Sequence, residues 1–116
     1  MRIITTTDTE VYLTDGSITY SGFPSTTLSA AATLSVVCAV TFTYGTGTAT
    51  VVATIGSTAT TLLSATATTA KASYTLTIPS GTDLSTVSVK ISTDMEGYES
   101  SVRNFIDVSI YEIYIQ

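Results

Sequence analysis

The sequence contains no histidine, no tryptophan and a single cysteine, and charged residues make up only 11% of its 116 positions. One cysteine cannot form a disulfide within the chain, so the fold has no disulfide framework. Cys38 lies in an apolar run, residues 34–40, where a thiol behaves as a small core residue. Without a histidine to lower the thiol pKa, a nucleophilic role is disfavoured. The four Lys and Arg residues and the net charge of −5 exclude a basic nucleic-acid binder.

Long hydrophobic runs are also missing. The N-terminal residues lack the stretch of about 7–15 apolar residues that marks a secretory signal. No segment reaches the roughly 18 apolar residues of a membrane-spanning helix. We therefore expect no signal peptide and no membrane span.

The residues that are present favour strands throughout. Hydrophobic residues make up 44% of the chain, enough for a core, and they alternate with threonine and serine. We expect turns at residues 15–17 and 45–47 because of their glycines. The predicted strands are residues 10–14, 18–20, 34–44, 48–55, 59–66, 73–78, 87–91 and 104–115.

This pattern predicts an all-β fold, a single antiparallel β-sandwich with jelly-roll or immunoglobulin-like topology, which strand counting does not separate. Residues 28–116 would form the sandwich. Residues 1–27 would be either its first strands or an N-terminal arm that anchors on a neighbouring chain by adding a strand to its edge.

The terminal segment changes phase. Its apolar residues fall at even positions up to Ile110 and at odd positions afterwards, where they are Tyr111, Ile113 and Ile115. A straight strand cannot direct both sets to one face. Either a β-bulge near Ile110 resets the phase, or the last residues pack on another subunit.

The strand pattern resembles a known family. The segments at residues 34–42, 48–56, 73–79, 84–92 and 105–111 are similar to the galactose-binding-like jelly roll of carbohydrate-binding modules, and residues 106–110 (Ile-Asp-Val-Ser-Ile) are similar to its last strand. The resemblance spans about residues 28–115. It implies a two-sheet jelly roll, a fold that also resembles accessory domains of phage virions and tail fibres.

Sugar-binding platforms in that family use exposed aromatic rings, tryptophan above all. This chain has no tryptophan. The aromatic residues expected in or beside loops are Tyr20, Phe23, Tyr44 and Tyr98, and the candidate platform is Phe23, Tyr44 and Tyr98. They are either a ligand platform or plugs at the rim of the core. Packing is the commoner use of such residues.

The residues for metal binding and catalysis are sparse. Asp94, Glu96 and Glu99 form one acidic cluster around a glycine and are a weak calcium candidate, with a solvated loop as the alternative. Scattered carboxylates, without a histidine or a glycine-rich phosphate loop, argue against an enzyme. We expect no cofactor.

These features favour a non-enzymatic structural subunit of a larger assembly. Few lysines protect the strand edges, and such edges pair readily with other chains. We expect contacts through Val11, Tyr12 and Leu13 of the arm and through Tyr111, Ile113 and Ile115 of the last strand. The resemblance suggests a phage virion protein (a capsid decoration, head-fibre or tail component) that forms a homo-oligomer or binds other virion subunits and is assembled in the host cytoplasm. The alternative is a monomeric glycan-binding module.

Overall fold

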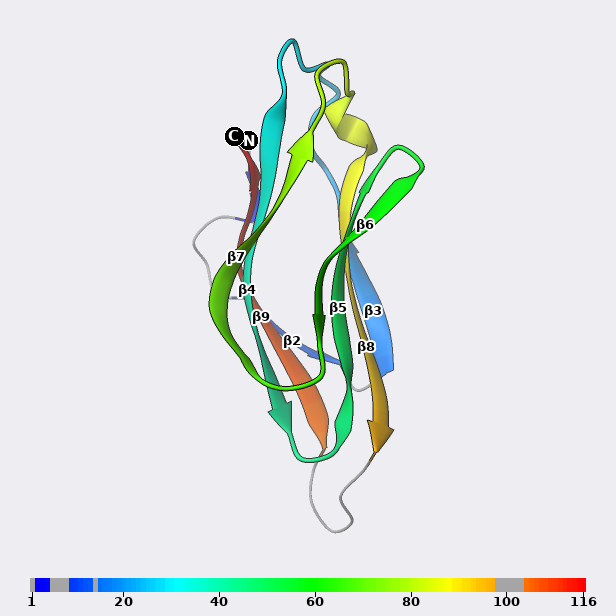
Figure 1. Cartoon of the computed structure of the whole chain (residues 1–116), viewed down its shortest axis with the longest axis vertical. Helices are drawn as coiled ribbons and strands as arrows, with labels where there is room; N and C mark the ends of the chain where they lie inside the picture. Colours follow the sequence, from blue (N-terminus) through cyan, green and yellow to red (C-terminus); the bar gives the residue numbers. More distant parts are fainter. Residues whose placement is uncertain (1, 5–8, 14, 98–103) are drawn as a thin grey trace.

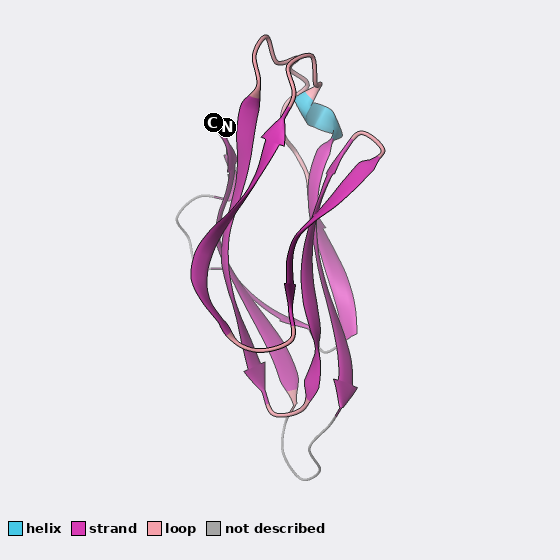
Figure 2. Ribbon diagram, in the orientation of Figure 1, coloured by secondary structure: helices cyan, strands magenta, loops and turns pink. Residues whose placement is uncertain are grey.

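The structure is a computed structural model. It describes residues 2–4, 9–13, 15–97 and 104–116, with side chains from residue 16 onward. Strands make up most of it, with one short 3₁₀ helix (Figure 2). Its elements are β1 (Arg2–Ile4), β2 (Thr9–Leu13), β3 (Asp15–Tyr20), β4 (Ala32–Thr43), β5 (Thr46–Ile55), β6 (Thr58–Ala65), β7 (Thr69–Ile78), η1 (Leu84–Thr86), β8 (Val87–Gly97) and β9 (Phe105–Ile115). The described part contains no helix with the length and hydropathy needed to cross a bilayer.

The strands form two antiparallel sheets that face each other, as Figure 1 shows edge-on. Sheet A has the order β1-β9-β4-β7, with β2 also paired to β9, and sheet B has the order β3-β8-β5-β6. The predicted all-β sandwich is therefore confirmed.

The connectivity is that of a jelly roll. Consecutive strands β5 and β6 form a hairpin, and around it β4 pairs with β7, β3 with β8 and β2 with β9. This nested ribbon is wrapped into two sheets by the pairs β4–β9 and β5–β8. An immunoglobulin-like sandwich instead pairs several consecutive strands within its sheets.

The described strands among the first 20 residues belong to the sandwich. β1 and β2 pair with opposite halves of β9, and β3 pairs with β8 over its whole length. Both sheets therefore take strands from the segment considered as an arm. The turn expected at residues 15–17 is not there, because Asp15, Gly16 and Ser17 are the start of β3.

The core lies between the sheets and follows from the alternation of side chains along each strand. In β5 and β8 every second residue is buried, while the residues between them, mostly threonine and serine, face outward. The largest fully buried side chains are Leu34, Ile78, Leu84, Ile91, Ile106, Ile110 and Ile113. Since one face of each sheet is apolar, the register of the central strands is strongly specified.

A β-bulge resets the phase of β9. Val37 pairs with Glu112 and Cys38 with Ile110, so Tyr111 has no partner residue on β4. Ile110 and Ile113 then both face the core, although three positions separate them. Of the two alternatives for the terminal segment, the structure has the bulge.

The end of the sandwich beside η1 is closed by two loops bound to each other. Thr27 and Asp83 form an isolated bridge, and the backbone N–H of Leu28 donates to the carbonyl of Thr82. The Asp83 carboxylate accepts hydrogen bonds from the Ser85 N–H and hydroxyl at 3.0 and 2.9 Å. It also accepts a bond from the Ser25 hydroxyl at 3.2 Å. These bonds lower the pKa of Asp83 below its ordinary value, the backbone bond from Ser85 most of all.

Candidate functional site

The two described residues of the proposed ligand platform, Phe23 and Tyr44, do not lie together. Phe23 is 4% exposed and belongs to the hydrophobic core, so its assignment to a platform is wrong. The loop after β3 folds over the end of the core, and Phe23 fills the rim as a plug. Tyr98 lies outside the described residues. Tyr44 remains, at the other end of the sandwich.

Tyr44 is the most exposed large hydrophobic side chain among the described residues, with 59% of its surface accessible. It has a φ of 51°, a left-handed conformation that is rare for a bulky residue. The following Gly45 also has a positive φ, and a Cβ there would collide with the Gly97 carbonyl oxygen. The turn between β4 and β5 is thus formed by Tyr44 and Gly45, whereas the sequence predicted residues 45–47. It presents the exposed ring of Tyr44 on a constrained backbone.

The acidic cluster is not a loop site. Asp94 and Glu96 are exposed on the outer face of strand β8, and Glu99 lies outside the described residues. Within the described part of the chain, no three His, Cys, Asp or Glu side chains lie close enough to hold a metal ion together. The two carboxylates that are described support no more than a solvated, negatively charged strand face.

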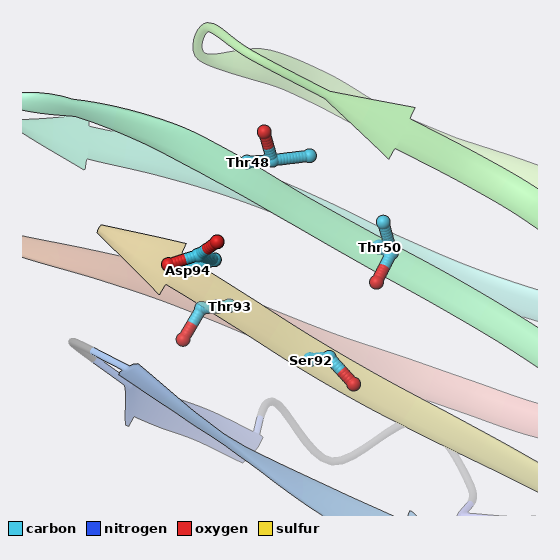
Figure 3. Close-up of a pocket in the computed structure, with 5 residues that line it drawn as sticks. All are labelled: Thr48, Thr50, Ser92, Thr93 and Asp94. Atoms are coloured by element: carbon cyan, nitrogen blue, oxygen red, sulfur yellow. The ribbon is translucent and has the colours of Figure 1, made fainter. Parts of the chain in front are cut away.

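A hollow of about 230 Å³ lies on sheet B around the pairing of β5 with β8. Its lining consists of Thr48, Thr50, Ser92, Thr93 and Asp94 (Figure 3). Hydroxyl groups and one carboxylate supply hydrogen-bonding groups, as Figure 3 shows along the two strands. Thr93 faces the core, and its buried Oγ1 has no hydrogen-bond partner.

Two of the six residues expected to contact another subunit are buried inside their own chain. Ile113 is completely buried and Ile115 is 6% exposed, both within the core of their own chain. Their assignment to an intersubunit face is wrong, because the bulge at Tyr111 directs them inward. Tyr111 itself faces outward, with the Lys71 Nζ 4.1 Å from the centre of its ring. Val11, Tyr12 and Leu13 pair through their backbones with Val108, Asp107 and Ile106 of the same chain.

Cys38 lies on β4 and is fully buried in the hydrophobic core. Burial raises the pKa of its thiol to about 11, because the apolar surroundings disfavour the thiolate. The uncharged thiol is a weak nucleophile, so Cys38 acts as a core side chain.

The feature that sequence reasoning missed is the edge formed by β6 and β7. Among the described strands, β6 pairs only with β5 and β7 only with β4, and the two lie in front in Figure 1. A groove of about 260 Å³ runs between them, lined by Ile55, Thr58, Thr60, Leu76, Thr77 and Pro79. The sequence carries one signal of this edge, since residues 16–82 contain no aspartate or glutamate.

Comparison of the chain with protein-family models, with curated proteins and with solved structures gave no match.

Proposed function

We propose that the chain is a non-enzymatic structural subunit of a larger assembly, of the kind that decorates a phage capsid or forms a head fibre or tail. The observation that carries the proposal is the unpaired edge of β6 and β7. These strands of 8 and 10 residues contain one charged residue, Lys71, and no proline. Long edges without charge or proline pair readily with strands of other chains.

The connectivity is compatible with a role in a virion. Jelly rolls occur in viral capsid proteins and in lectins, so the fold is compatible with assembly and with glycan binding, and it does not choose between them. The exposed edge favours assembly, because a monomeric binding module gains nothing from an unprotected strand. The last strand offers no free edge for such pairing, since β9 is flanked by β4 on one side and by β1 and β2 on the other.

Light scattering of the purified chain over a range of concentrations tests this proposal. We expect a mass that rises with concentration in multiples of the 12.1 kDa subunit, and regular particles or fibres in electron micrographs. A mass that stays at one subunit, together with glycan binding, would contradict the assembly role.

Glycan binding is the second candidate, and Tyr44 is the observation that favours it. An exposed ring can stack on the apolar face of a sugar, and the constrained turn holds it in place. In a glycan screen, Tyr44→Ala would then abolish binding, whereas Tyr74→Ala, at a half-buried ring of β7, would leave it intact. No bound glycan in a broad screen counts against this candidate.

A further inference from the structure

Charge is divided between two halves of the sandwich. All nine acidic residues lie outside residues 16–82, and Lys71 is the one charged residue within that stretch. Strands β4, β5, β6 and β7 therefore form an acid-free half, whereas β2, β3, β8 and β9 form an acid-bearing half. The sheet orders place the two acid-free pairs at one side of both sheets. Two copies with a net charge of −5 repel each other least when these acid-free sides meet.

Within the acid-free half, β7 presents the more regular edge. Its residues Ala72–Ile78 pair with β4 without interruption, from Cys38 with Ala72 to Ala32 with Ile78. By contrast, β6 has a bulge at Leu62, since Val51 pairs with Leu63 and Val52 with Thr61. Bulges weaken an edge for further pairing, so β7 is the better template.

We propose that β7 of one copy pairs antiparallel with β7 of a second copy, through residues 72–78 and across a twofold axis at Thr75. This dimer rests on the proposed assembly function and names its contact. In this register Tyr74 faces Leu76 of the second copy, Ser73 faces Thr77, and Thr75 faces itself. Apolar residues oppose apolar residues and hydroxyls oppose hydroxyls, so the segment is complementary to itself.

The contact also covers apolar surface that one copy leaves open. Tyr74, Leu76 and Leu62 are only partly buried, although they pack against the core. They lie on the strands that border the β6–β7 groove. A second β7 would continue sheet A and place its own Tyr74 and Leu76 on the same inner face, which removes these side chains from water.

The variant Thr75→Lys tests the contact. Thr75 is exposed on the outer face of sheet A, so a lysine is compatible with the folded monomer, but across the axis it would face another lysine. Like charges opposite each other destabilise strand pairing, and we expect the dimer dissociation constant to rise about tenfold or more. Thr41→Lys is the matched control, with the same change of charge on exposed Thr41 of internal strand β4. It should leave the constant within about twofold of the wild type.

Oxidation of the variant Thr75→Cys gives a second measurement. Opposed residues of antiparallel strands have Cα atoms about 4.5–5.5 Å apart, a separation that a disulfide spans. We expect a covalent dimer from Thr75→Cys and none from Thr41→Cys, while the buried Cys38 stays unreacted. If the wild type associates and the Thr75 variants behave as the Thr41 controls do, the β7 contact is wrong and the assembly function stands. A wild type that remains monomeric up to about 1 mM contradicts both.

Discussion

The two sides of the sandwich solve the problem of exposed strand edges differently. On the acid-bearing side, β1 and β2 cover β9 and β3 covers β8, and the strands carry aspartate and glutamate. On the acid-free side, β6 and β7 end the sheets with threonine, alanine and leucine. Charge on an edge discourages pairing with other chains. This difference in edge protection is the basis of the proposed contact through β7.

The N-terminal strands complete both sheets on the acid-bearing side. Deleting residues 1–20 removes β1, β2 and β3 and leaves β9 and β8 without their outer partners. We expect the truncated chain to lose its cooperative thermal unfolding transition, measured by circular dichroism, and to aggregate. A truncated chain that unfolds cooperatively near the wild-type midpoint would show that these strands belong to an arm and not to the folded domain.

The next largest effect compares one core residue from each side. Ile113 of β9 is completely buried, and Ile113→Ala should lower the free energy of unfolding by about 2–5 kcal/mol because it leaves a cavity. Leu76 of β7 is only partly buried, so Leu76→Ala should cost about 1 kcal/mol in the dilute monomer. Urea unfolding at low protein concentration measures both.

Association should reverse this order. At high concentration Leu76→Ala should weaken the dimer more than Ile113→Ala does, since Leu76 faces Tyr74 of the second copy in the proposed contact. Equal losses of stability in the two monomers would mean that the β6–β7 edge is packed as tightly as the interior.

Sequence alternation predicted most of the strands, because it follows from the position of residues along one segment, but it missed β1 and placed a turn where β3 begins. The change of parity after Ile110 required either a bulge or an external partner, and the β9 register contains the bulge. Pairing between distant strands leaves no such local signal. Strand counting left the jelly-roll and immunoglobulin-like orders open, and the acid-free edge came only from the sheet topology.

The errors in the candidate site have local causes. Phe23 was expected in an exposed loop, but that loop folds over the core and buries the ring. The turn before β5 was placed on the glycines at residues 45–47. The structure places Tyr44 in the left-handed position instead, and Gly47 in β5, where a Cβ would collide with the Asp94 carbonyl oxygen. A glycine can mark a close approach of two backbones as well as a turn, and sequence alone does not separate these uses.

Thr93 offers a smaller test on the acid-bearing side. Its hydroxyl is buried beside Ala49 and Gly16 in the register and has no hydrogen-bond partner. Thr93→Val removes the unsatisfied group with little change of shape and should raise the free energy of unfolding by about 1–2 kcal/mol. Thr77→Val, at an exposed position of β7, should change it by less than about 0.5 kcal/mol. A destabilised Thr93→Val protein would indicate that the hydroxyl does have a partner in solution.

The smallest effect lies where the acid-free stretch ends, at Asp83. Hydrogen bonds from Ser85 and Ser25 lower the pKa of this carboxyl in the folded state below its value of about 3.9 in the unfolded chain. A lowered folded-state pKa contributes stability that is present above the unfolded value and is lost as the pH falls through the folded one. The stability advantage of the wild type over Asp83→Asn should therefore shrink as the pH falls below about 5, first through the unfolded pKa and then through the lowered folded one. Ser85→Ala removes a hydroxyl bond of 2.9 Å and should reduce this pH-dependent advantage more than Ser25→Ala, whose bonds are 3.2 and 3.3 Å. Because Asp83 is only partly buried, solvent screening keeps the effect small, and urea unfolding at several pH values with all four proteins is the measurement that resolves it. An advantage over Asp83→Asn that does not change with pH would mean that the loops are held by their backbone bonds alone.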